Sequence, residues 1–176
     1  MNESEILMSD AQKQAAAFDV RRVKLLHIAH TFLGIGLASF SLAALGHSGQ
    51  HVALSDYAGQ PLIVNFFASW CVPCKQETPL LAKFYHAEHG KVALVGLDEN
   101  DAAGSAVSFT QKEGVGYPVG FDPEVIAASA YGVAGLPQTF FLNAQHRIVD
   151  RVFGAVTQAE INRGMALATG AQAPAG

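Results

Sequence analysis

The sequence predicts an α/β fold with a mixed central β-sheet, helices on both of its faces and an N-terminal β-hairpin. Two near-continuous apolar runs, residues 62–67 and 92–97, are typical of strands that are covered on both faces. Helical patterns follow both runs, which favours parallel strands joined by crossover helices. Residues 139–142 and 147–153 then form an antiparallel pair around a turn. The chain of 176 residues is long enough for one domain with a sizeable core and an extension.

The net charge and the cysteine count limit the kinds of partner and of disulfide that the protein can have. The net charge is −4, and the eleven Lys and Arg residues form no long run, so nothing in the charge pattern supports a nucleic-acid partner. The chain has two cysteines, which leaves none for a framework of structural disulfides. The cysteine count does not fix the compartment, because redox-active dithiols work in both reducing and oxidising spaces.

Residues 1–24 are polar, and we expect them to form a disordered tail. The apolar segment that follows, residues 25–38, has two interpretations. Arg21, Arg22 and Lys24 precede it, and basic residues before about 20 mostly apolar ones are typical of a signal-anchor. Two histidines, two glycines and several Ser or Thr residues make the stretch a poor membrane span, so the alternative is the start of the domain. The paired arginines resemble a twin-arginine export signal only weakly.

Residues 39–54 predict the β-hairpin. Polar and apolar residues alternate over 39–42, residues 46–49 are turn material, and 52–54 resume an extended pattern. This hairpin and a signal-anchor compete for the same residues, and we favour the hairpin.

The domain is expected to span residues 39–168, before a disordered tail over residues 169–176. A helix is predicted from the cysteine motif to about His89, with a kink at Pro79. The other predicted segments are a turn or helical start at 55–57, a helix at 102–113, an extended link at 117–121, a helix opened by 122–124, and a last helix opened by a capping box of Thr157 and Glu160.

The two cysteines, Cys71 and Cys74, stand just after a predicted strand and at the start of a predicted helix. This Cys-x-x-Cys arrangement is typical of a dithiol/disulfide redox site. The attacking species in thiol exchange is the thiolate, and unpaired N–H groups at a helix start favour its charge at Cys71. Pro73 is tolerated in the first turn, where its missing N–H has no partner. Cys74 would attack the mixed disulfide and release the substrate.

Two other interpretations of the cysteine pair are open. A structural zinc site needs four ligands, and the sequence has no second cysteine pair and no close His pair downstream, so no metal is expected. A purely structural disulfide over so short a loop removes little entropy from the unfolded chain. The acidic residues 98–101 are interpreted as a solvated loop rather than a metal site.

Two segments carry a resemblance to a known family: residues 64–77, VNFFASWCVPCKQE, and residues 131–140, YGVAGLPQTF. Residues 40–42 and 54–61 also fit the family's opening hairpin and its lead into the first core strand. On these residues the chain resembles the TlpA/ResA-like thiol–disulfide oxidoreductases of the thioredoxin superfamily, over roughly residues 39–167. The resemblance implies a thioredoxin-like fold.

The resemblance also implies substrate-binding residues. Pro137 is expected to follow a cis peptide bond and to lie against the cysteines, leaving the backbone of Leu136 free to hydrogen-bond an extended substrate segment. The alternative is an ordinary turn proline, since only about 5–6 % of X–Pro bonds in folded proteins are cis. Trp70 and Pro73, beside and between the cysteines, complete the expected set.

Two residues bear on proton transfer. Classical thioredoxin has a buried Asp on the strand before the motif, whereas this chain has Asn65, which cannot take up a proton. Glu77, three residues after Cys74, is similar to the acid found there in the resembling family, and we expect it to assist proton transfer at Cys74. The alternative is that Glu77 is a solvated acid of the first helical turn.

The predicted function is therefore exchange of the dithiol/disulfide pair with protein disulfides. The resemblance implies a reductase of exported proteins, for example in cytochrome c maturation, with a thiol electron donor in the membrane and no bound cofactor. Similar proteins are tethered on the outer side of the cytoplasmic membrane, and a cytoplasmic location is the alternative.

Two other functions are weighed against this one. Peroxiredoxins share the superfamily, but they have a Thr three residues before the reactive cysteine, where this chain has Ala68. A redox-inactive binding module is the non-enzymatic alternative, and the intact cysteine pair argues against it.

Overall fold

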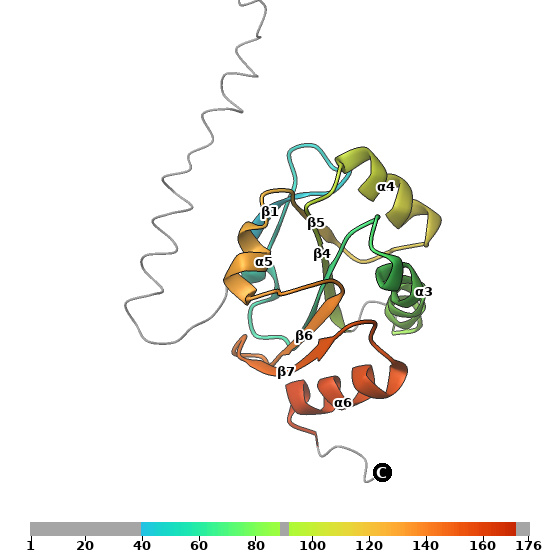
Figure 1. The fold of residues 1–176 in the computed structure, drawn as a ribbon. Helices are drawn as coiled ribbons and strands as arrows, with labels where there is room; N and C mark the ends of the chain where they lie inside the picture. The colour runs from blue at the N-terminus through green and yellow to red at the C-terminus, as the bar shows by residue number, and fades with distance from the viewer. Residues whose placement is uncertain (1–39, 89–91, 172–176) are drawn as a thin grey trace, which may run out of the picture. The chain divides into compact units, whose positions relative to one another are not determined.

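A seven-stranded mixed sheet forms the centre of the structure, a computed structural model that describes residues 40–88 and 92–171 (Figure 1). The strands are β1 (Ser41–Ala44), β2 (His51–Ala53), β3 (Leu62–Phe67), β4 (Ala93–Glu99), β5 (Val119–Asp122), β6 (Gln138–Leu142) and β7 (Ile148–Phe153). Their order in the sheet is β2-β1-β5-β4-β3-β6-β7. Strands β3, β4 and β5 are parallel, and the other neighbouring pairs are antiparallel, which confirms the predicted mixed sheet.

Helices cover both faces of the sheet, as predicted. The helical segments are a 3-10 turn, η2 (Leu54–Tyr57), and α3 (Val72–Ala87), α4 (Ala103–Lys112), α5 (Ile126–Tyr131) and α6 (Gln158–Thr169). Residues of α3, α4 and α6 pack in one buried cluster, and those of α5 pack in a second cluster on the opposite face. The two crossovers β3-α3-β4 and β4-α4-β5 therefore lie on the same side of the parallel strands (Figure 1).

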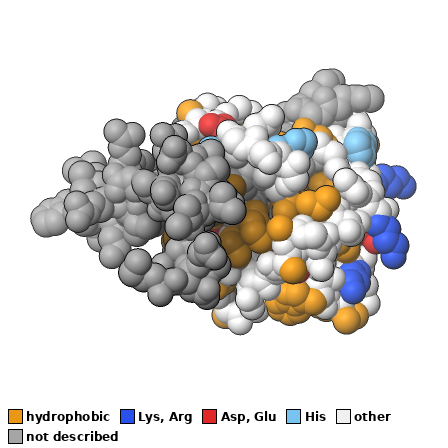
Figure 2. All heavy atoms as spheres, turned by 90° about the horizontal axis from the view of Figure 1, so that it is seen from above, with side chains coloured by type: hydrophobic (Ala, Val, Ile, Leu, Met, Phe, Trp, Pro, Cys, Tyr) orange, Lys and Arg blue, Asp and Glu red, His pale blue; other side chains and the backbone are white. Residues whose placement is uncertain are grey.

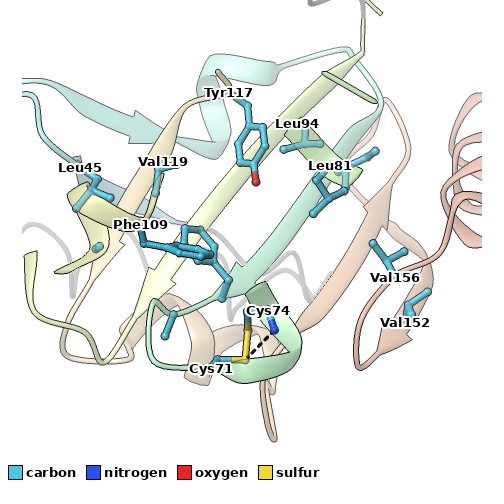
Figure 3. Packing of buried hydrophobic residues seen from close by; sticks show 14 of the residues in the cluster. Leu45, Cys71, Cys74, Leu81, Leu94, Phe109, Tyr117, Val119, Val152 and Val156 are labelled. Carbon is cyan, nitrogen blue, oxygen red and sulfur yellow. Dashed lines mark hydrogen bonds between the residues drawn. A yellow bond between two sulfur atoms is a disulfide. The ribbon is translucent and has the colours of Figure 1, made fainter. Parts of the chain in front are cut away.

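Alternation along β3 separates the two clusters. Ile63 and Phe67 face the α3 side, whereas Val64 and Phe66 face the α5 side. Figure 3 shows the α3-side cluster, in which Phe109, Leu81 and their neighbours pack above the cysteine pair. Because side chains alternate, Asn65 must point to the α3 side, toward the helix that carries the cysteines. It is fully buried there.

The predicted N-terminal hairpin is confirmed. Strands β1 and β2 pair with Leu42 opposite Val52, and β1 also pairs with β5, so the hairpin extends the central sheet. The 1–24 tail and the 25–38 apolar segment lie outside the described residues. Within the part of the chain that the structure describes, no helix is long and apolar enough to cross a membrane.

The predicted extended link at 117–121 is wrong, because most of it belongs to β5, which lies inside the sheet between β1 and β4. Pro118 and Gly120 made this segment look like a connection. In the sheet Gly120 has little space around it, since a Cβ there would lie 3.0 Å from Leu97 Cδ2 and 3.2 Å from Leu42 Cβ. The missing side chain thus allows close packing rather than a turn.

Three other boundaries differ from the prediction. Asp98 and Glu99, expected in a solvated loop, are the buried last residues of β4. The helix expected to open at 122–124 begins at Ile126, although the Asp122 carboxylate does accept hydrogen bonds from the N–H groups of Ile126 and Ala128, at 2.8 and 3.0 Å. Thr169, assigned to the C-terminal tail, is the last residue of α6.

Part of the surface is apolar. On the face shown in Figure 2, hydrophobic side chains lie between polar ones, and the Lys and Arg side chains are at one margin. Two of the large apolar side chains that remain exposed, Trp70 and Val72, stand on either side of Cys71 in the sequence.

Candidate active site

The two cysteines form a disulfide at the start of α3. The Cys71 and Cys74 sulfur atoms are 2.08 Å apart, and the two Cα atoms are 5.2 Å apart. Cys71 is the N-cap residue of the helix, and its Sγ accepts a hydrogen bond from the Cys74 N–H at 3.2 Å (Figure 3). This donor and the other unpaired N–H groups of the first turn would stabilise a thiolate on Cys71 in the reduced protein. The structure thus confirms the predicted position at the helix start.

The two sulfur-bearing residues are not equally accessible. Cys71 is 4 % exposed and Cys74 is fully buried. Trp70, 55 % exposed, and Val72, 66 % exposed, flank the accessible cysteine. Pro73 occupies the first turn of α3, as expected, and is half-buried. An incoming sulfur atom would therefore meet Cys71 first, between apolar side chains.

Glu77 lies one turn beyond Cys74 and is 1 % exposed, so its interpretation as a solvated acid is wrong. Its Oε1 accepts a hydrogen bond from Asn65 Nδ2 at 2.6 Å, and its Oε2 accepts one from the Val156 N–H at 2.7 Å. Burial raises the pKa of Glu77 to about 7, against the opposing effect of these two hydrogen bonds. A carboxyl group with this pKa is suited to hold or release a proton near neutral pH.

Asn65 joins Glu77 to the sheet. Its Nδ2 also donates to Thr139 Oγ1 on β6 at 3.0 Å, so one amide group bridges α3 and two strands. Its Oδ1 has no hydrogen-bond partner among the described residues, and neither does the buried hydroxyl of Tyr117. The amide orients Glu77 but cannot exchange a proton with it.

The peptide bond between Leu136 and Pro137 is cis, as the resemblance implied. Phe66 on β3 pairs with Gln138 on β6, so Pro137 stands at the end of β3 where the chain turns into the cysteine motif. Pro137 is buried and Leu136 is half-buried. The Pro137 carbonyl accepts a hydrogen bond from the Gly154 N–H at 3.0 Å, whereas the Leu136 backbone makes none within the described residues.

Sequence reasoning missed a second loop that holds the motif. The Ser69 N–H donates to Asp101 Oδ2 at 2.6 Å, and Trp70 Nε1 donates to the Asn100 carbonyl at 3.0 Å. Both acceptors follow β4. Because the carboxyl ends of parallel strands share one edge of a sheet, the polar residues after β4 were the available signal for this contact.

Nothing in the described residues resembles a metal centre, since no three His, Cys, Asp or Glu side chains are grouped as ligands.

Comparison with known proteins identifies the family. A sequence model of the AhpC/TSA family matches residues 35–151, which is more than half of the chain. The chain belongs to this family. Within it, the resemblance to ResA-like proteins is confirmed by named relatives.

The thiol-disulfide oxidoreductase ResA of Bacillus subtilis (strain 168) is 33 % identical over 116 residues, which are 65 % of this chain and 65 % of ResA. The thiol:disulfide interchange protein CycY of Rhizobium leguminosarum bv. viciae is 34 % identical over 116 residues, 64 % of this chain and 61 % of CycY. The chain thus spans slightly less than two thirds of the length of either relative.

A solved structure confirms the fold. The crystal structure of a putative thiol:disulfide interchange protein DsbE from Chlorobium tepidum matches with a TM-score of 0.67 and 25 % identity, covering 77 % of this chain and 96 % of that one. The predicted thioredoxin-like fold, with its N-terminal hairpin, is therefore correct.

Proposed function

We propose that this protein is a thiol–disulfide oxidoreductase that exchanges its Cys71/Cys74 pair with disulfides of other proteins. The observation that carries the proposal is the disulfide at the start of α3, with Cys71 as the helix cap and Cys74 fully buried behind it. The names of the ResA and CycY relatives support the same chemistry. The cysteine pair itself carries the two electrons, so the exchange requires no bound cofactor.

In the reductive direction, the Cys71 thiolate attacks one sulfur of a substrate disulfide. The substrate S–S bond breaks, its other sulfur leaves as a thiolate and takes a proton, and Cys71 is joined to the substrate in a mixed disulfide. Cys74 then loses its proton and attacks Cys71 Sγ, which releases the second substrate thiolate. The substrate gains two electrons, and the protein ends with the Cys71–Cys74 disulfide.

Glu77 is proposed to accept the proton of Cys74. It lies on the same helix, three residues further on, and burial raises its pKa to about 7. Asn65 and Val156 hold both carboxyl oxygens by hydrogen bonds, so the group is oriented before the reaction begins.

Four residues are proposed to bind the substrate: Trp70, Pro73, Leu136 and Pro137. The exposed Trp70 side chain gives apolar contact beside Cys71. The backbone of Leu136, which has no hydrogen-bond partner within the described ranges, is suited to hydrogen-bond an extended polypeptide, as in strand addition. An unfolded or extended segment around the substrate disulfide fits this arrangement.

The substrates are proposed to be exported proteins, including apocytochrome c, kept reduced with electrons from a membrane-bound thiol donor. This proposal places the protein on the outer side of the cytoplasmic membrane, anchored through residues 25–38, and its alternative is a cytoplasmic protein. Fractionation of the full-length protein combined with thiol labelling distinguishes them. Labelling of Cys71 by a membrane-impermeant reagent in intact cells supports the outer location, and protection until lysis contradicts it.

The test of the function uses the two cysteine variants separately. Cys71→Ser is expected to abolish disulfide reductase turnover, because no thiolate remains to attack. Cys74→Ser is expected to trap mixed disulfides, because Cys71 still attacks but nothing resolves the product. Full turnover by Cys71→Ser contradicts the proposal.

Two measurements separate this function from the alternatives. Peroxide consumption by the reduced protein, faster than its reduction of protein disulfides, would indicate a peroxidase. In a titration with glutathione buffers, a cysteine pair that does not change its redox state would indicate a redox-inactive binding module.

A further inference from the structure

The segment that leads into Cys71 is held from the side by the loop after β4. Residues 68–70 connect β3 to the disulfide. The Asp101 carboxylate accepts the Ser69 N–H at 2.6 Å through Oδ2 and the Ala102 N–H at 2.7 Å through Oδ1. The Trp70 ring nitrogen donates to the Asn100 carbonyl at 3.0 Å. One carboxylate and one carbonyl from the same loop therefore fix the two residues before the reactive cysteine.

A second carboxyl group, that of Asp98, belongs to the end of β4 that leads into this loop. Asp98 is 0 % exposed, and neither of its oxygens has a donor among the described residues. In the sheet it is paired with Phe67 on β3 and with Phe121 on β5, so its neighbours in both strands are aromatic. The polar group that it meets is the Asp101 carboxyl, and a hydrogen bond between two carboxyl groups exists only when one of them keeps a proton.

The charges around Asp98 favour that proton. Burial raises the pKa of Asp98 to about 8, and the neighbouring Asp101 and Glu99 act in the same direction. Glu99 in turn is paired with Asp122 on β5. Among the described residues, the ion pair that involves an Arg joins Arg163 to Asp150 and not to any of these acids. Residues 68–70, which the Asp101 loop contacts, are Ala, Ser and Trp and carry no charged side chain.

We propose that Asp98 and Asp101 share one proton, and that this carboxyl pair is a positioning device for residues 68–70 and hence for Cys71. Asp98 donates the shared proton to Asp101, whose other lone pairs receive the Ser69 and Ala102 N–H groups. When the proton is lost, two carboxylates stand in contact inside the protein and repel each other. Asp101 then moves from Ser69, and the Trp70 contact with the same loop is lost as well.

The carboxyl pair rests on the proposed function in one respect: the positioning of Cys71 has a functional consequence because Cys71 is the proposed attacking residue. Its test does not need turnover. Trp70 is the single Trp of the chain and belongs to the segment that the pair holds, so its fluorescence reports the position of that segment. The probe is therefore intrinsic to the disulfide form of the protein.

The experiment is a fluorescence titration of the full-length disulfide form from about pH 6 to about pH 9, where ordinary tyrosines are still mostly protonated. The wild-type protein is expected to show a transition near pH 8. In Asp98→Asn the transition is expected to disappear, because the amide N–H donates to Asp101 at every pH. Glu99→Gln is the matched control: it changes an adjacent buried acid on the other face of β4 and is expected to keep the transition.

A wild-type titration with no transition overturns the proposal, and so does a transition that Glu99→Gln removes and Asp98→Asn keeps. If Asp98→Asn does not fold, carboxyl carbon NMR of the wild-type protein provides the test. The Asp98 resonance is expected to move near pH 8, and an Asp98 group that is already a carboxylate at pH 6 overturns the pair. Loss of reductase activity alone, with the fluorescence transition intact, contradicts the proposed function and leaves the carboxyl pair supported.

Discussion

At the scale of single residues, burial controls the protonation of the Glu77 carboxyl group in the site. The Glu77 carboxyl is held by Asn65 and Val156 and has a pKa raised to about 7 from the ordinary 4.5. The folded protein therefore binds more protons than the unfolded chain between these two values. Stability falls with rising pH over that interval, because deprotonation costs more in the folded state than in the unfolded one.

The substitution Glu77→Gln tests this linkage. The variant lacks the titration, and the unpartnered Asn65 Oδ1 is available to accept from the new amide. Relative to the wild type, the variant is expected to gain on the order of 1–3 kcal/mol in free energy of unfolding as pH rises from about 4.5 to about 8. Denaturant unfolding of both disulfide forms at the two pH values measures this change. A difference in stability that does not depend on pH would show that Glu77 has an ordinary pKa.

The residues of the site could be predicted from the sequence where the signal is local or carried by family resemblance. Cys71 and Cys74 follow from their spacing and from the helix start, and Pro137 and Glu77 follow from the resemblance. Asp98 could not be found this way. An acidic residue beside other acidic residues is normally solvated, whereas Asp98 is buried because β4 is a central strand that pairs it with Phe67 and Phe121.

At the scale of elements, α6 depends on one position without a side chain. Gly164 lies in the middle of the helix and is buried against β6. A Cβ at this position would overlap the ring of Phe141, which is itself fully buried and cannot withdraw. Glycine therefore sets the close approach of α6 to the sheet, although it is a poor helix former.

The pair Gly164→Ala and Gly104→Ala separates packing from helix propensity. Gly104 lies in α4, where an added Cβ would meet no neighbouring atom within 4 Å, so alanine there is expected to be neutral or stabilising by up to about 1 kcal/mol. Gly164→Ala is expected to destabilise by about 1–3 kcal/mol, since overpacking outweighs the better propensity. Thermal or denaturant unfolding of the two variants measures both values. Equal effects would mean that α6 can shift away from the sheet at no cost.

The elements that the sequence predicted correctly are those with a clear periodicity of apolar residues or with a helix-capping motif. The capping box of Thr157 and Glu160 is present at the start of α6, with Glu160 Oε2 accepting the Thr157 N–H at 2.8 Å. Strand β5 was missed, because four residues containing a glycine after a proline have too short a pattern to indicate a strand. Its pairing with β1 and β4 is non-local, and that pairing makes it a strand.

At the scale of the whole molecule, the hairpin is part of the core rather than an appendage. Phe40 and Val52 are buried in the α5-side cluster, and the Phe40 ring lies 6.4 Å from that of Tyr131. Strand β1 covers the edge of β5, which would otherwise expose unpaired backbone groups. The cysteine pair lies at the carboxyl end of β3, so the sheet that the hairpin completes also carries the site.

This arrangement predicts where the chain can be shortened. Residues Leu37–Gly176 form one compact unit, so a chain that begins at Leu37 is expected to unfold cooperatively, at the same denaturant midpoint as the full-length protein, and to keep its reductase turnover. A chain that begins at Leu54 lacks the hairpin and is expected to lose the folded state. The single change Phe40→Ala is the control, with an expected loss of about 3–5 kcal/mol from the emptied core position. If the chain from Leu54 folded and reduced disulfides as well as the longer one, the hairpin would be dispensable, and the burial of Phe40 and Val52 would contribute nothing measurable.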